Sequence, residues 1–344
     1  MLDAVLFVTA AVAAWLLTRW IKSWAPKMHL LDIPNQRSMH AQATPRGGGL
    51  AIVVVSLIGL MATLVVEPRP DWAVFGGYVA GALLIAGVSF LDDLNKVPAG
   101  YRLATHFVAA VLMVAGLAPQ LTAGKEGAIA WLIVGAGILW TVGLTNAYNF
   151  MDGIDGLAAT QGIVTGTGWA VLAAVSHKPF LELFALLIAA GCIGFLIHNW
   201  PPARIFMGDV GSAFLGFTFA YLALAIQPVT PLVTLVGALL LWPFIFDATL
   251  AVLRRAVRGE NIFAAHRSHL YQRLVLAGWH HGSVAALYGA FAMVVFFVGL
   301  EWQLTRSAAI GYVLFAALFL LSSGLWFLVN CAERVRSSEP GRAR

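Results

Sequence analysis

The stretch WAVFGGYVAGALLIAGVSFLDDLNK (72–96) runs through twenty uncharged, mostly apolar residues and then reaches two adjacent aspartates. An α-helix of about 20 apolar residues is long enough to cross the hydrocarbon core of a bilayer, which is about 30 Å thick. Ten similar stretches occur elsewhere in the chain, at 3–20, 49–66, 103–118, 127–147, 157–176, 180–197, 211–226, 231–253, 283–300 and 307–329. The sequence therefore predicts an all-α, polytopic integral membrane protein with about eleven transmembrane helices.

The composition of the 344-residue chain supports this fold class. Hydrophobic residues make up 60% of it and charged residues only 11%, whereas a typical soluble domain carries about 25% charged residues. This balance excludes a soluble globular enzyme, a disordered segment and a disulfide-stapled secreted domain. The two cysteines, Cys192 and Cys331, lie far apart and indicate neither a zinc ribbon nor a disulfide framework. We interpret the net charge of +5 as loops that face an anionic membrane surface, with no nucleic-acid partner.

Lysine and arginine are distributed unevenly between the loops. With eleven crossings, the loops on one side hold 17 Lys and Arg residues and the opposite loops hold four. The positive-inside rule places the richer side in the cytoplasm. We therefore expect a cytoplasmic C-terminus, an N-terminus on the periplasmic side, and one transmembrane domain over residues 1–330 followed by a polar cytoplasmic tail over 331–344.

Carboxylates collect on the predicted cytoplasmic side. Five of the nine aspartates lie in three short loops, FLDDLNK (90–96), NFMDGIDG (149–156) and FMGDVGS (206–212). These loops follow the third, fifth and seventh predicted helices, so the alternation of spans puts all three on one face. The loop after the ninth helix adds HRSHLYQRL (266–274) to the same face. We expect the active site on these cytoplasmic loops.

This group of residues suits a divalent cation and a phosphorylated ligand. Adjacent carboxylates repel each other unless a cation or a proton lies between them. Oxygen ligands without nearby cysteines favour Mg²⁺, with Mn²⁺ as the alternative, over zinc. Glycines beside the aspartates let the backbone approach a bulky ligand and offer N–H donors to phosphate oxygens. Helix capping accounts for a single aspartate of this kind, but not for three such sites on one face.

Three other features keep more than one interpretation at this stage. His266 and His269 are compatible with a phosphate contact, with part of a zinc site or with a helix surface. Asp247, inside the ninth predicted helix, is compatible with structural support or with catalysis. In the first loop, RSMHAQATPRGGG (37–49) combines basic residues with a glycine turn that enters the second helix, an arrangement that can bind an anion.

Together, five motifs resemble those of the polyprenyl-phosphate N-acetylhexosamine-1-phosphate transferases: RSMHAQATPRGGG, LDDLNK, NAYNFMDGIDGLA, IFMGDVGSAFLG and HRSHLYQRL. They occur in the expected order over roughly residues 30–275. The resemblance implies an enzyme of the bacterial inner membrane that transfers HexNAc-1-phosphate from a UDP-HexNAc to undecaprenyl phosphate and releases UMP. It also implies Mg²⁺ as cofactor, and a homodimer is the one assembly that we consider.

The resemblance further implies roles for individual residues. Asp92 and Asp93 are expected beside the reacting phosphates, with one of them as a candidate base, and Asp152 is expected to support this catalytic centre. Asn149 and Asp209 are expected to hold Mg²⁺ on the sugar-nucleotide pyrophosphate. We leave the choice between Asp92 and Asp93 open.

Substrate contacts are also implied by the resemblance. Asp155 is expected to contact the nucleotide base, Phe206 to stack on uracil, and the two histidines to meet the phosphates or the sugar. The full set of implied substrate-binding residues is Arg46, Lys96, Arg102, Asp155, Phe206, His266 and His269. In the histidine motif, Arg267 and Ser268 separate the histidines, as in the branch that initiates O-antigen with UDP-FucNAc or UDP-QuiNAc, which makes plain UDP-GlcNAc a less favoured donor.

An ion-coupled transporter of an anionic solute is the alternative function. Transporters keep ionisable groups near the bilayer midplane and often contain internal repeats. Here the carboxylates cluster at one face and the sequence shows no repeat at a fixed period, which favours the transferase. A CDP-alcohol phosphotransferase is disfavoured because Asp152 is not followed by the DGxxAR pattern.

Overall fold

The computed structural model describes residues 2–34, 39, 42–64, 71–226, 231–261 and 266–338. Two basic residues of the first-loop motif, Arg37 and His40, lie outside the described residues, as does the end of the predicted tail from residue 339 onward. Every other predicted site residue is described.

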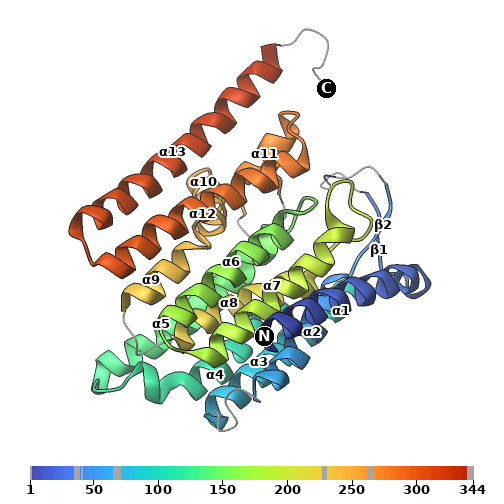
Figure 1. Ribbon diagram of the computed structural model, residues 1–344. Helices are drawn as coiled ribbons and strands as arrows, with labels where there is room; N and C mark the ends of the chain where they lie inside the picture. Colours follow the sequence, from blue (N-terminus) through green and yellow to red (C-terminus); the bar gives the residue numbers. More distant parts are fainter. Residues whose placement is uncertain are drawn as a thin grey trace.

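Helices make up most of the described chain (Figure 1). In chain order they are α1 (Leu2–Trp24), the 3₁₀-helix η1 (Ala25–Met28), α2 (Gly49–Thr63), α3 (Trp72–Asn95), α4 (Ala99–Leu121), α5 (Gly127–Phe150), α6 (Leu157–Val175), α7 (Pro179–Asn199), α8 (Asp209–Ala225), α9 (Pro231–Leu239), α10 (Trp242–Val257), α11 (Leu270–Leu276), α12 (His281–Thr305) and α13 (Ala308–Ser338). Between η1 and α2, the two-residue strands β1 (Leu31–Asp32) and β2 (Thr44–Pro45) form an antiparallel pair. The prediction of an all-α membrane protein is confirmed.

Eight helices are long and apolar enough to cross a membrane: α1 with η1, α3, α4, α5, α6, α7, α12 and α13. The pair α9 and α10 adds a ninth crossing if it is counted as one span, and α2 and α8 are shorter apolar helices. The described residues therefore contain eight or nine candidate spans by length and composition, and the total of eleven stays a prediction.

The ninth predicted helix differs from its prediction. The stretch 231–253 is not one straight helix, because α9 and α10 meet at a bend of 70°. Pro243 stands in the first turn of α10, where its missing N–H costs nothing. A proline also disfavours helical backbone at the residue before it, so the α9 helix cannot continue unchanged through this point.

Helix α8 occupies the centre of the bundle and fixes the position of the site. Its residues from Val210 to Ala223 are all buried, and it packs on α2, α3, α4, α5, α6 and α9. The approach of α2 depends on two glycines, since a Cβ atom on Gly49 would lie 2.4 Å from the Cα atom of Gly211. The start of α8 is thereby held against the start of α2.

The outer helices form the two edges of the bundle (Figure 1). Helix α13 packs on α12 at one edge, and α1 packs on α7 and α2 at the other. The ends of α3 and α5 and the starts of α4, α6 and α8 lie at the same end of the bundle, because consecutive helices alternate in direction. The aspartate motifs therefore meet, as the sequence predicts.

Candidate active site

The end of α3 separates its two adjacent aspartates. Helix α3 stops at Lys96, which adopts the left-handed conformation (φ 52°) and donates its N–H to the carbonyl oxygen of Asp92 at 3.0 Å. Successive residues on a helix project about 100° apart. Asp93 consequently points into the bundle and is 1% exposed, whereas Asp92 faces the partly open side.

Asp93 caps the first turn of α8. Its carboxylate accepts hydrogen bonds from the N–H groups of Asp209 (3.1 Å) and Val210 (3.2 Å). Gly208 precedes this turn with φ 76°, and a Cβ atom there would lie 2.6 Å from the Asp93 Oδ2. A carboxylate at a helix N-terminus satisfies otherwise unpaired donors and interacts favourably with the helix dipole. Asp93 therefore positions Asp209 and is enclosed by the groups that it holds.

Arg46 supports the same junction. Its guanidinium donates to the backbone carbonyl oxygens of Asp92 (3.3 Å) and Asp93, and its Nε lies 3.8 Å from the Asp93 carboxylate. The last carbonyls of a helix have no partner within the helix. Arg46 supplies one, and the structure places it on the end of α3 and not in the pocket.

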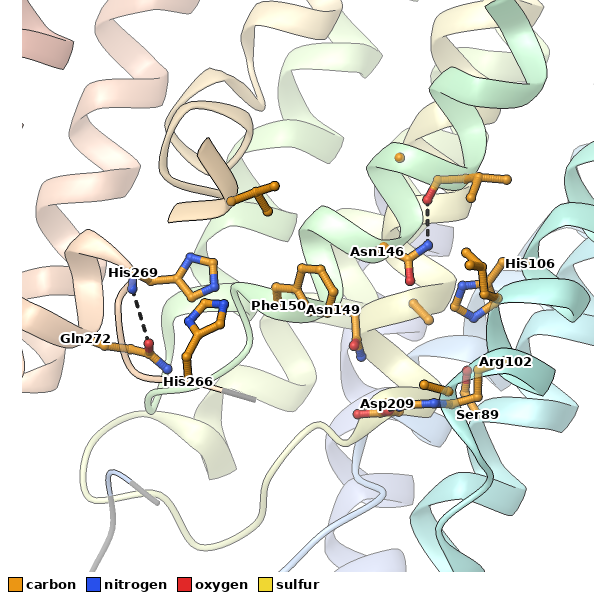
Figure 2. Close-up of a pocket in the computed structure, with 16 residues that line it drawn as sticks. Ser89, Arg102, His106, Asn146, Asn149, Phe150, Asp209, His266, His269 and Gln272 are labelled. Carbon is orange, nitrogen blue, oxygen red and sulfur yellow. Dashed lines mark hydrogen bonds and ion pairs between the residues drawn. The ribbon is translucent and has the colours of Figure 1, made fainter. Parts of the chain in front are cut away.

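Asp92 and Asp209 converge on one cation. The Arg102 Nη1, at the start of α4, lies 2.9 Å from the Asp92 Oδ2 and 2.8 Å from the Asp209 Oδ2. Figure 2 shows Arg102 against Asp209 at one end of the pocket. The three side chains keep partial exposure, 32% for Arg102 and Asp209 and 14% for Asp92. The position between these two carboxylates is therefore a cation site in contact with solvent.

A cavity of about 450 Å³ begins at this ion-pair cluster. Its polar lining includes five of the predicted site residues, Arg102, Asn149, Asp209, His266 and His269, which come from four different parts of the chain (Figure 2). Its apolar walls come from side chains of α4, α5, α8 and α10, namely Leu103, Val142, Ala213 and Val252. The cavity therefore joins charged groups at helix ends to an apolar space between the helices.

Asn149 is oriented by α8. Its Nδ2 donates to the Ser212 Oγ at 2.9 Å, one turn after Asp209. This bond leaves the Asn149 Oδ1 available for another partner in the pocket.

The histidine motif lies at the other end of the pocket. His269 immediately precedes α11 and is 4% exposed, and its ring lies 5.0 Å from that of His266. The His266 Nδ1 lies 2.8 Å from the Ser268 Oγ and accepts from the Ser268 N–H at 3.3 Å. Burial, and then the nearby His269 and Arg255, lower the pKa of His266 to about 4. His266 is therefore a neutral imidazole near neutral pH.

Asp152 and Asp155 belong to the loop after α5. Burial raises the pKa of Asp152 well above its usual range, and the carboxylates of Asp209, Asp93 and Asp155 raise it further. Asp155 accepts the Ala203 N–H at 3.0 Å. Its carboxylate also lies 3.4 Å from the His281 Nδ1. Burial and the neighbouring carboxylates both favour the neutral form of Asp152, and a cation bound nearby would oppose this effect.

The other predicted residues are placed around the pocket but do not line it. Phe206 lies in an extended segment, where its N–H donates to the Pro45 carbonyl and its carbonyl accepts the Gly48 N–H. Lys96 is exposed at the end of α3. The predicted residues outside the pocket lining are Arg46, Asp92, Asp93, Lys96, Asp152, Asp155 and Phe206.

The donor set fits Mg²⁺ held jointly with a substrate. Asp92 and Asp209 already converge on a positive group, and the Asn149 Oδ1 offers a third hard oxygen ligand. Among the described residues, no three His, Cys, Asp or Glu side chains are grouped closely enough to hold a metal by themselves. Mg²⁺ in proteins commonly binds one or two carboxylates and completes its shell with water and phosphate oxygens.

Most residues of the pocket lining were not predicted from the sequence, and two of them are polar residues deep in apolar helices. His106 and Asn146 lie inside α4 and α5, where they line the cavity, and His106 is 5% exposed. The signal that could have found them is a polar side chain inside an otherwise apolar span. For His106 a second signal is its position four residues after Arg102, on the same helix face.

Fold and site together define a class of protein. It is a multi-pass membrane protein with a pocket that opens at helix ends and combines carboxylates, an arginine and histidines, the groups that phosphoryl transfer uses.

Comparison with known proteins gives a concordant result. A family model described as glycosyl transferase family 4 matches residues 75–227. A probable undecaprenyl-phosphate N-acetylglucosaminyl 1-phosphate transferase of Bacillus subtilis is 32% identical over 92% of this chain and 88% of the relative. A decaprenyl-phosphate N-acetylglucosaminephosphotransferase of Mycolicibacterium smegmatis is 30% identical over 81% of this chain and 76% of its own. A phospho-N-acetylmuramoyl-pentapeptide-transferase of Moorella thermoacetica is 30% identical over 81% and 88%, respectively.

The chain therefore belongs to the polyprenyl-phosphate N-acetylhexosamine-1-phosphate transferase family. The predicted family is confirmed, and with it an enzyme of the phospho-sugar transferase kind. None of these relatives gives support to the transporter alternative.

Proposed function

We propose that the protein transfers HexNAc-1-phosphate from a UDP-HexNAc to undecaprenyl phosphate, releasing UMP and forming undecaprenyl-diphosphate-HexNAc. The observation that carries this proposal is the convergence of Asp92 and Asp209 on the Arg102 guanidinium at one end of a pocket whose other end holds His266 and His269. Such a pocket offers a cation site, an arginine and neutral hydrogen-bonding groups to one ligand.

The shape of the pocket suits two substrates of different polarity. The ion-pair cluster is in contact with solvent, where a water-soluble pyrophosphate can reach it. The apolar walls from α4, α5 and α10 extend from the same point into the bundle. A lipid phosphate at the membrane interface and a sugar nucleotide from the aqueous side can therefore meet at Arg102.

In the proposed reaction, an oxygen of the acceptor phosphate forms a bond to the phosphorus that carries the sugar. The bond between that phosphorus and the oxygen of UMP breaks, and UMP leaves with the electron pair. The acceptor phosphate is already anionic near neutral pH, because its second pKa is about 6 by analogy with phosphorylated residues. A strong base is therefore not required, and we assign Asp92, the aspartate on the open side of α3, to orientation of the phosphates.

The remaining roles follow from the placement of the residues. Asp209, Asn149 and Asp92 would hold Mg²⁺, or Mn²⁺, which supplies charge neutralisation for the pyrophosphate when bound. Asp93 holds the start of α8, and Asp152 supports the site from the loop after α5. Since charge develops on the leaving phosphate, positioning and charge neutralisation are expected to supply most of the rate acceleration.

We further propose eleven crossings, in which the α9–α10 pair forms one span and the shorter α2 and α8 each form another. The site then faces the cytoplasm, the N-terminus is periplasmic and the C-terminus cytoplasmic, in the bacterial inner membrane. This orientation is supported by the excess of Lys and Arg in the loops on the side of the site. A homodimer is the assembly that we propose.

For the sugar, we propose a 6-deoxy HexNAc such as FucNAc or QuiNAc, with O-antigen or cell-surface polysaccharide initiation as the pathway. The proposal is supported by the HRSHLYQ sequence of the histidine motif (266–272). GlcNAc is the second candidate, because the relatives from Bacillus subtilis and Mycolicibacterium smegmatis carry it in their names.

The deciding experiment measures UMP release by membranes that contain the overexpressed protein. They receive Mg²⁺, undecaprenyl phosphate and, in separate reactions, UDP-GlcNAc, UDP-QuiNAc, UDP-FucNAc or UDP-MurNAc-pentapeptide. We expect UMP release that requires the lipid and is lost with EDTA, and the preferred donor identifies the sugar. No UMP from any donor, with folded protein in the membranes, would refute the proposal.

A further inference from the structure

Asp247 lies outside the ion-pair cluster, yet it makes the densest set of hydrogen bonds near the pocket. It is fully buried on α10. Its Oδ1 accepts the Leu270 N–H at 2.7 Å, and its Oδ2 accepts the Tyr271 N–H at 3.1 Å and the Tyr288 hydroxyl at 2.6 Å. The His269 Nδ1 lies 3.3 Å from the same Oδ1. Four donors from the start of α11 and from α12 thus surround one carboxylate.

These contacts determine the protonation pattern of His269. Both Asp247 oxygens already accept hydrogen bonds from fixed backbone N–H groups, so the His269 Nδ1 meets an acceptor; it carries the hydrogen and its Nε2 keeps a lone pair. In His266 the pattern is reversed. The backbone N–H of Ser268 is a fixed donor to the His266 Nδ1, so the neutral ring carries its hydrogen on Nε2.

We propose that Asp247 is a positioning residue that fixes His269 in the Nδ1–H form, beside a His266 in the Nε2–H form. The pair then offers one acceptor and one donor, side by side, to a ligand in the pocket that both rings line. A neutral ligand group with an adjacent donor and acceptor, such as a sugar hydroxyl beside an amide, matches this pair better than a phosphate oxygen does. The kinetic part of the inference rests on the proposed transfer reaction.

A carboxylate at position 247 can accept all four hydrogen bonds, whereas an amide has only one acceptor oxygen. In Asp247→Asn, one oxygen becomes an NH₂ group and faces donors that cannot move, since two of them belong to the backbone of α11. Tyr288→Phe is the matched control, because it removes one donor to the same carboxylate and leaves the His269 contact intact.

The first test is a double-mutant cycle on the full-length protein in lipid nanodiscs, with UMP release as the readout. We expect Asp247→Asn to lower kcat/KM for the UDP-sugar by about 10- to 100-fold, as loss of an orienting carboxylate does elsewhere. In a His269→Gln background, the same substitution should lower it by less than about threefold, because the two residues act as one unit. Tyr288→Phe should change it by less than about threefold. Multiplicative effects, or an equal loss in Tyr288→Phe, would overturn the inference.

The second test needs no activity. Nitrogen NMR of protein labelled in histidine, with His269→Gln to assign the signals, distinguishes a protonated from an unprotonated ring nitrogen. We expect Nδ1–H at His269 in the wild type and a mixture in Asp247→Asn; Nε2–H in the wild type would overturn the inference. If the wild type releases no UMP, the proposed function fails while this measurement still decides the role of Asp247.

Discussion

Removal of the Arg102 side-chain charge should raise the affinity of the protein for Mg²⁺ and lower its turnover rate. Arg102 bridges Asp92 and Asp209 at 2.9 and 2.8 Å, the position that the proposed cation would take. Two carboxylates that share one guanidinium nitrogen repel by about 4 kcal/mol at an effective dielectric constant of about 20, and partial exposure reduces this to about 1–2 kcal/mol. If Mg²⁺ binds as proposed, it has to displace the guanidinium from this cluster in the wild type, but not in Arg102→Met.

A difference of 1–2 kcal/mol corresponds to about tenfold in affinity. We expect the midpoint of thermal unfolding, measured in detergent without substrates at constant ionic strength, to rise at about tenfold lower Mg²⁺ concentration in Arg102→Met than in the wild type, because ligand binding to the folded state stabilises it. Turnover should fall at saturating Mg²⁺, since the displaced guanidinium is then missing from the phosphates.

Two variants control for other effects. Arg204→Met removes a positive charge from an exposed residue on the same end of the bundle and should leave the Mg²⁺ dependence unchanged. Asp209→Asn should abolish both the Mg²⁺-dependent stabilisation and activity. An identical Mg²⁺ titration for Arg102→Met and the wild type, with Asp209→Asn still insensitive, would refute competition between Arg102 and the cation.

Three further predictions concern the supports of the site. Asp93→Asn should lower the free energy of unfolding by about 2–3 kcal/mol as well as activity, because it breaks the cap of α8, whereas Asp92→Asn should lower UMP release without lowering the thermal midpoint. Gly208→Ala should cost about 1–3 kcal/mol through its positive φ and its contact with Asp93, which thermal unfolding measures; an unchanged midpoint would contradict the packing. The pKa of His266 is about 4 in the folded protein and about 6.5 in the unfolded chain. Between these pH values only the unfolded chain binds the proton, so the stability of the wild type falls as the pH drops from about 6.5 to about 4. His266→Gln should reduce this loss by about 1 kcal/mol, given the partial exposure of the ring, and identical pH dependence of the two proteins would contradict the assignment.

The helices were predictable because the bilayer imposes their length. A run such as 72–90 has one stable arrangement in a membrane, with every backbone hydrogen bond made inside the helix. The bend between α9 and α10 was missed because hydropathy does not report the direction of the chain, although Pro243 is a visible signal for it. Helix α11 was missed because seven residues are too few for a periodic pattern, and contacts with Asp247 and an Arg273–Glu333 ion pair hold it in place.

The sequence predicted where the site lies, but it did not predict which role each aspartate has. Alternation of the spans brings the aspartate motifs to one end of the bundle, and the structure places them there. The sequence could not separate Asp92 from Asp93, because the distinction depends on where α8 begins in space. Once the first turn of α8 lies against α3, one aspartate becomes its cap and the other is left for Arg102.

The charge balance at this end of the bundle supports the proposal that a cation takes part in the reaction. Asp93 is compensated by the first turn of α8 and by Arg46, but Asp92 and Asp209 share the single guanidinium of Arg102. Burial raises the pKa of Asp152, and the carboxylates of Asp209, Asp93 and Asp155 raise it further. Under the proposed function, a pyrophosphate would add further negative charge. A divalent cation would offset it and would leave the displaced Arg102 guanidinium free to meet the phosphate of the acceptor.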